Sequence, residues 1–165
     1  MEYVHLNTTQ ARHLIRSGSW KGPTTGLAPG YVQANLVVLP GAFAEEFATF
    51  CRLNPGPAPL LERTAPGNPH PMKLAPEADL RTDLPCYRVY REGKLVEVSE
   101  DLLSLWQEDF VAFLLGRSFS AEQALIAPGI RLRHLKQGRN VAPVPTVLSS
   151  QYEAMRWQVS RVQHW

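Results

Sequence analysis

The chain has 165 residues with 17 basic and 15 acidic side chains, and this near balance argues against a nucleic-acid or membrane-surface partner. Hydrophobic residues make up 44%, as in a globular protein with an ordinary core rather than in a disordered chain. The two cysteines form no zinc spacing or disulfide framework, and no apolar run approaches membrane-spanning length, so we expect a cytoplasmic protein with no metal site and no other cofactor.

The N-terminal third predicts two helices with one strand between them. The first helix is expected to start at Thr8 or Thr9, either of which can cap it, and to end near Ser17. Residues 32–39 form an apolar run that ends at a Pro-Gly pair, which is typical of a buried strand. Residues 42–53 follow as an amphipathic helix because phenylalanine recurs there at helical spacing.

The middle of the chain predicts a long loop, a hairpin and a helix. Residues 54–79 show little periodicity, so we expect a loop that wraps around the domain. Residues 86–91 and 94–98 are two alternating segments separated by Glu-Gly, which predicts a β-hairpin. Residues 99–115 place large apolar side chains at a 3.6-residue spacing and therefore predict a further helix.

The last third continues the interleaving of helices and strands. We expect a short helix over 120–126, a strand over 130–135 and a further helical stripe within 149–163. This alternation indicates the α/β class, with a mixed layered fold of sheet and helices.

A long Gly- and Pro-rich segment joins the first helix to the first strand. Glycines permit tight turns and close backbone approach, while prolines stiffen the turns between them. Two interpretations stay open: a ligand-binding loop, and a connection whose Gly and Pro residues are only structural. As a ligand loop it would bind substrate through Thr24, Thr25, Tyr31, Gln33 and Asn35.

Several separated blocks of this sequence carry a family resemblance. They read ARHLIRSGSWKGPTTGLAPGYVQANLVVLP, FATFCRLNPGPAPLL, ADLRTDLPCYRVYREG, LWQEDFVAFLLGRSFSAEQAL and GIRLRHLKQGRNV. Together they resemble the bacterial "Putative hydro-lyase" family, whose animal relatives are D-glutamate cyclases. On this resemblance residues 1–141 are the N-terminal part of the family's domain, and 142–165 are a divergent tail, helical or disordered. We accordingly expect an incomplete version of the family's larger fold, whose uncovered surface would favour a homo-oligomer.

The resemblance implies a lyase that converts D-glutamate to 5-oxoproline and water. Its partner is then a small-molecule carboxylate or amino acid. The site must hold the α-carboxylate, take protons from the ammonium group and release an oxygen from the γ-carboxylate. The alternative is a truncated, non-catalytic domain that binds a small carboxylate or a protein partner without turnover.

The segment ADLRTDLP contains the densest group of side chains suited to that chemistry. We expect this segment to be extended. We interpret Asp83 and Arg81 as catalytic residues, Asp83 being the acid/base; the alternative is an ion-pair network that pins the loop to the hairpin. The remaining predicted substrate-binding residues are Arg88 in the hairpin, which could equally be a half-buried strand residue, and Arg139 with Asn140 in the GRNV motif.

Overall fold

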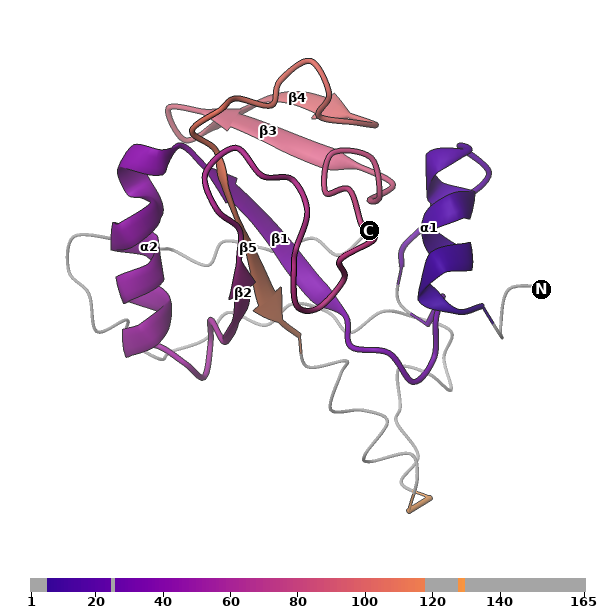
Figure 1. Ribbon diagram of the computed structural model, residues 1–165. Coiled ribbons are helices and arrows are strands. Elements are labelled where there is room, and N and C mark those ends of the chain that lie inside the picture. The colour runs from indigo at the N-terminus through magenta and orange to yellow at the C-terminus, as the bar shows by residue number, and fades with distance from the viewer. Residues whose placement is uncertain (1–5, 25, 118–127, 130–165) are drawn as a thin grey trace.

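The structure is a computed structural model that describes residues 6–24, 26–117 and 128–129 (Figure 1). Helices and antiparallel sheets alternate along these residues, which confirms the predicted mixed class. The elements are α1 (Thr8–Arg16), β1 (Ala34–Leu39), α2 (Gly41–Leu53), β2 (Leu60–Arg63), β3 (Tyr87–Arg91), β4 (Lys94–Ser99) and β5 (Val111–Gly116).

A three-stranded antiparallel sheet forms the centre of the described part, with the strand order β1-β5-β2. Strand β5 is the last in sequence yet lies between the other two. It pairs with β1 in a continuous register from Ala34 opposite Gly116 to Leu39 opposite Val111. Its pairing with β2 is shorter and contains an irregularity between Leu60 and Glu62.

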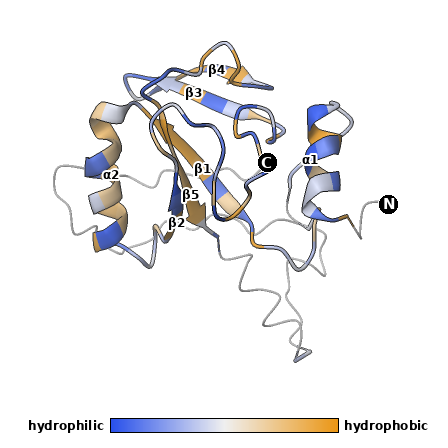
Figure 2. Cartoon of the chain, in the orientation of Figure 1, coloured by the Kyte–Doolittle hydropathy of each residue, from blue (hydrophilic) through white to orange (hydrophobic). Residues whose placement is uncertain are grey.

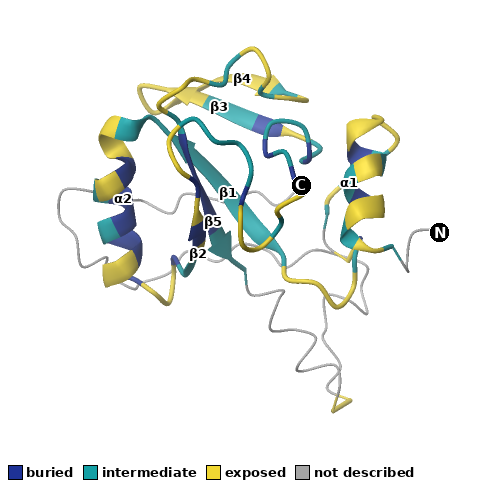
Figure 3. Cartoon of the chain, viewed as in Figure 1, coloured by how far each residue is buried: buried dark blue, intermediate teal, exposed yellow. Residues whose placement is uncertain are grey.

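The sheet is buried on both faces. Helix α2 covers one face, where Phe47 meets Phe113 edge-on with ring centroids 4.9 Å apart. On the other face Leu80 from the long loop packs with Ala112 and with Trp106. Ala112 and Phe113 are 0% exposed, and β5 is among the most buried segments in Figure 3. Figure 2 shows the matching concentration of hydrophobic residues along β1, β5 and one side of α2.

Helix α1 stands apart from the sheet and packs on the Gly-rich segment. Its N-cap is Asn7, which precedes both of the predicted caps, Thr8 and Thr9. Asn7 forms a capping box with Gln10: each side chain accepts a hydrogen bond from the other residue's backbone N–H, at 2.9 and 3.0 Å. The amide oxygen of Asn7 therefore supplies the cap that we assigned to a threonine hydroxyl.

The apolar face of α1 contacts the Gly-rich segment directly. Ala11 and Ile15 form a small cluster with Leu27, and the partly buried Trp20 packs against it. Burial of these side chains is what attaches the segment to the helix.

The predicted helix over residues 99–115 is wrong. Trp106 N–H donates to Leu102 O at 2.9 Å in a single turn, and the chain then enters strand β5 at Val111. The run VAFLLG is apolar at every position except the last, so it suits a strand that is buried on both faces and hydrogen-bonded on both edges. Strand β2 likewise interrupts the loop predicted over 54–79.

The predicted hairpin is present as β3 and β4. Its two turn residues, Glu92 and Gly93, have φ angles of +51° and +74°. A two-residue hairpin turn with positive φ at both positions matches the twist of the strands, and glycine adopts it without steric cost.

The predictions for 120–126, 130–135, 149–163 and the tail 142–165 lie outside the described residues. Within the described residues, neither helix is long and apolar enough to cross a bilayer.

Candidate functional site

The segment ADLRTDLP forms a tight turn. Asp83 N–H and Thr82 N–H both donate to Asp79 O, at 3.0 and 3.1 Å. The backbone is therefore helical over one turn, and the extended conformation that we predicted here is wrong. The carboxylate of Asp83 folds back over the turn and accepts a hydrogen bond from Asp79 N–H at 2.9 Å.

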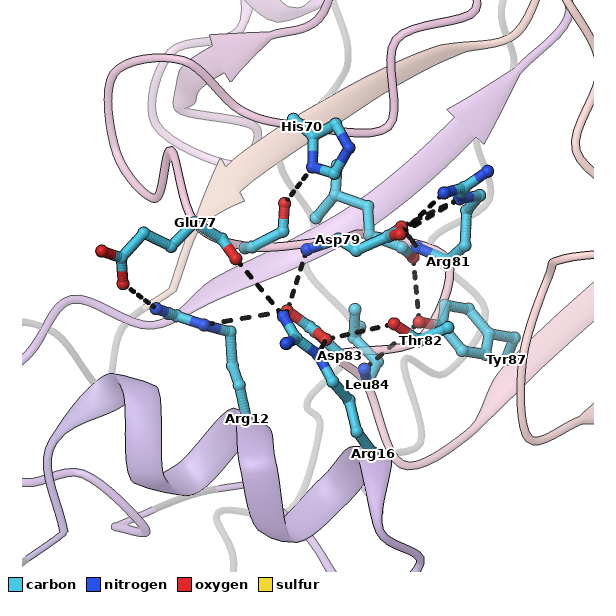
Figure 4. A network of polar contacts seen from close by, with 12 residues as sticks. Arg12, Arg16, His70, Glu77, Asp79, Arg81, Thr82, Asp83, Leu84 and Tyr87 are labelled. Atoms are coloured by element: carbon cyan, nitrogen blue, oxygen red, sulfur yellow. Dashed lines mark hydrogen bonds and ion pairs between the residues drawn. The ribbon is translucent and has the colours of Figure 1, made fainter.

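Asp83 lies at the centre of a polar network between this turn and α1 (Figure 4). Its side chain is only 3% exposed. Arg16 donates to both of its carboxylate oxygens, from Nε to Oδ1 and from Nη2 to Oδ2, the latter at 2.6 Å. Thr82 Oγ1 donates to Oδ1 at 3.2 Å, and Arg12 Nε lies 3.7 Å from Oδ2. The hydrogen bond to Asp83 raises the pKa of Arg16 although partial burial opposes this shift.

A second, more exposed pair lies on the outside of the same turn. Arg81 donates to Asp79 through Nε, at 3.0 Å to Oδ1, and through Nη2, at 2.8 Å to Oδ2. Burial alone would raise the pKa of Asp79, but the hydrogen bonds and charge of Arg81 outweigh burial and hold it below its usual value. Arg81 is thus paired with Asp79 rather than with Asp83.

The turn is tied to the hairpin by a tyrosine hydroxyl. Tyr87 at the start of β3 donates to Leu80 O at 2.9 Å and accepts from Leu84 N–H at 3.2 Å. Burial raises the pKa of Tyr87 well above its ordinary value, so the hydroxyl stays protonated. The ion pairs therefore hold the turn to α1, whereas its tie to the hairpin is a neutral hydrogen bond.

The other predicted site residues are spread over several elements. Gln33 Nε2 donates to the backbone oxygen of Thr24 at 3.0 Å, so these two are brought together. Tyr31 is 52% exposed, Asn35 lies in β1 opposite Leu115, and Arg88 lies half-buried in β3. Thr25, Arg139 and Asn140 lie outside the described residues.

Helix α1 connects the two predicted regions. Its Ala11 and Ile15 pack on the Gly-rich segment, while Arg12 and Arg16 face the acidic turn. We assigned no role to either arginine from the sequence. Their i, i+4 spacing, which puts both on one side of a helix, is the signal that could have identified them.

Comparison with known proteins shows what this chain is similar to. The family model described as D-glutamate cyclase matches residues 111–157. The "Putative hydro-lyase" of Rubrobacter xylanophilus is 60% identical over 132 residues, which is 80% of this chain and 51% of that protein. The "Putative hydro-lyase" of Verminephrobacter eiseniae is 53% identical over 136 residues, or 82% of this chain and 50% of that protein. Over most of its length the chain is similar to the "Putative hydro-lyase" family.

The chain spans about half the length of the curated hydro-lyases that it matches, and it corresponds to their N-terminal part. The "Putative hydro-lyase" of Stutzerimonas stutzeri is 46% identical over 149 residues, 90% of this chain. The D-glutamate cyclase match extends to residue 157, and the division of the chain at residue 141 stays a prediction.

The side chains around the turn define the chemistry that this part of the chain can support. Guanidinium groups bind carboxylates in a forked geometry, and carboxylates accept protons. In the part of the chain that the structure describes, no three His, Cys, Asp or Glu side chains form a group that could hold a metal ion. The arginines and carboxylates around the turn are groups that can bind anions and transfer protons.

Proposed function

We propose that the chain forms the N-terminal part of the site of a water-eliminating lyase that converts D-glutamate to 5-oxoproline. The observation that carries the proposal is the similarity to hydro-lyases at 46–60% identity, with a D-glutamate cyclase match in the same chain. The cluster of arginines and carboxylates around Asp83 supports it, because the substrate carries two carboxylates and an ammonium group.

The reaction closes a ring between the two ends of the amino acid. The α-nitrogen forms a bond to the γ-carbon, and the bond from that carbon to one of its oxygens breaks. The ammonium group gives up two protons, and the departing oxygen takes them up as water. A site for this reaction needs a cation to hold a carboxylate and a carboxyl group to move protons.

Asp83 is our candidate for the proton transfers, and Arg81 is our candidate for binding the carboxylate. Both already have bonding partners, so each would have to exchange a contact when substrate binds. Asp83 accepts from Arg16, Thr82 and the Asp79 backbone, so a substrate amine would have to replace one of these donors. Arg81 would have to share its guanidinium between Asp79 and the substrate. The turn and α1 would then rearrange when substrate binds.

A second candidate function is binding of a small carboxylate without turnover. The observation that favours it is that both acids of the turn, Asp79 and Asp83, are already engaged by arginines. For Asp79, the hydrogen bonds and charge of Arg81 stabilise the ionised form and make this carboxylate a weak proton acceptor.

Product formation by a full-length relative tests the proposal. The purified Rubrobacter protein is incubated with D-glutamate and, separately, with L-glutamate, and 5-oxoproline is followed by chromatography. An enzyme-free sample at the same pH and temperature corrects for spontaneous cyclisation. We expect enzyme-dependent product from D-glutamate. Production no faster than in the enzyme-free sample with either isomer would refute the lyase and leave the binding function.

A further inference from the structure

Helix α1 presents two arginines to the same acidic turn, and they differ in how they contact its carboxylates. Arg16 forms three hydrogen bonds: it donates twice to Asp83, and its Nη2 also donates to the backbone oxygen of Glu77 at 3.3 Å. Arg12 lies one helical turn earlier. Its nearest carboxylate oxygens are at 3.7 Å on Asp83 and 4.0 Å on Glu77, and among the described residues it forms no hydrogen bond.

The position of Arg12 makes its unused donors significant. Its side chain is 17% exposed, and its guanidinium carries five N–H donors. Asp83 cannot accept from them, because its two oxygens already accept four hydrogen bonds from Arg16, Thr82 and Asp79. The guanidinium of Arg12 therefore has donors from which another carboxylate can accept.

The other neighbour of Arg12 is only loosely held. The side chain of Glu77 is 74% exposed, and its carboxylate accepts one long hydrogen bond, from Thr9 Oγ1 at 3.4 Å. In Figure 4 the guanidinium of Arg12 lies between the carboxylates of Glu77 and Asp83. An ion pair that is exposed on one side contributes little free energy, so Glu77 can move into solvent at small cost.

We propose that Arg12 binds a carboxylate of the amino-acid substrate, and that the carboxylate of Glu77 occupies this position until the substrate displaces it. The choice of ligand rests on the proposed function. Once Glu77 has moved away, three arginines face the carboxylates of Asp79 and Asp83, which leaves one positive charge for an incoming carboxylate. A guanidinium fork can then form the paired hydrogen bonds that Glu77 does not make.

Two substitutions in the 165-residue chain test this pairing with D-glutamate as the probe, measured by isothermal titration calorimetry. Arg12→Gln should weaken binding about 10- to 100-fold, the loss of a charge-assisted hydrogen-bonded pair. Glu77→Gln should tighten binding about two- to fivefold, because it removes a competing charge from an exposed pair. Arg52→Gln is the matched control: Arg52 is exposed on α2 and donates to Thr49, so its loss should leave the dissociation constant unchanged.

The measured affinities either support or overturn the proposal. Unchanged affinity in Arg12→Gln, weaker or equal affinity in Glu77→Gln, or no saturable binding by the unmodified chain would overturn it. If Arg12→Gln unfolds, as judged by circular dichroism, the Glu77→Gln result decides alone, since that exposed change leaves the fold intact. Binding that depends on Arg12, together with no 5-oxoproline from a relative, would refute the lyase and keep this inference.

Discussion

The carboxylate of Asp83 joins parts of the chain that are distant in sequence. Arg16 reaches it from α1, 67 residues earlier, and the backbone of Asp79 reaches it from within the turn. Four residues later, Tyr87 holds the same turn to the hairpin. A single buried acid can have this effect because each of its oxygens accepts more than one hydrogen bond.

Replacing Asp83 by Asn should destabilise the protein. The amide keeps the shape of the side chain but leaves the charge of Arg16 without its partner, and we expect a loss of about 2 kcal/mol in the free energy of unfolding. Urea denaturation measures it. Asp101→Asn is the matched control, because Asp101 is exposed and the amide oxygen can still accept from Leu103 N–H. Equal stability of the two variants would show that Asp83 does not hold α1 to the turn.

Asp79 should make the stability depend on pH below about pH 4. Its pKa is lowered in the folded state, so its contribution is fully present above the unfolded value of about 3.9 and is lost as the pH falls through the folded value. Asp79→Asn should cost up to about 1 kcal/mol at pH 7, and this cost should shrink as the pH falls below about 4 toward the lowered folded pKa. Denaturation curves at pH 7 and at successively lower pH values measure the difference. A gap of the same size at each pH would contradict the assignment.

At the scale of elements, the local sequence was sufficient to predict a helix or strand where residue types determine the backbone conformation. Glu92-Gly93 predicts the hairpin because the turn needs positive φ. The phenylalanines of α2 predict a helix because their spacing fits one buried stripe, although Phe43 is 52% exposed while Phe47 and Phe50 are buried. These elements depend little on distant parts of the chain.

Elements that depend on distant partners could not be predicted in this way. Strand β5 reads as a helix in sequence, and only its pairing with β1 and β2 on both edges makes it a strand. The candidate site has the same property. Asp83 was identified from its own segment, but its partner Arg16 belongs to α1, and nothing in the local pattern of either segment specifies the contact.

The long loop is held to the segment that precedes β5 by close contacts of the Gly67 backbone. Gly67 N–H donates to Phe110 O at 2.8 Å, and Gly67 O accepts from Trp106 Nε1 at 2.9 Å. A Cβ on Gly67 would lie 2.6 Å from the backbone oxygen of Glu108. The loop therefore approaches residues 106–110 as closely as its backbone permits.

Gly67→Ala should consequently cost much more than Gly93→Ala. The two glycines have the same φ of +74°, so both variants lose about 1 kcal/mol from backbone strain. Nothing lies within 4 Å of a Cβ on Gly93, whereas the clash at Gly67 adds about 1–3 kcal/mol. Thermal denaturation of the pair measures the difference. Similar melting temperatures would mean that the loop can move away from Glu108 freely.

At the scale of the whole molecule, the matched part of this chain covers only about half of the hydro-lyases to which it is similar. Active sites commonly draw residues from distant segments, and each missing group that touches the substrate costs about three orders of magnitude in rate. We expect the 165-residue chain to cyclise D-glutamate far more slowly than the Rubrobacter protein under the same conditions. Comparable turnover numbers would show that these residues hold the whole catalytic site.

The most direct test of the proposed reaction follows the oxygen that leaves. The Rubrobacter protein is given D-glutamate carrying ¹⁸O in both γ-carboxylate oxygens, and the product is analysed by mass spectrometry. Attack of the amine on the γ-carbon predicts 5-oxoproline with a single ¹⁸O, in the ring carbonyl, and the release of labelled water. Consumption of D-glutamate to an open-chain product that keeps both labelled oxygens would contradict ring closure and show that the enzyme removes a different group.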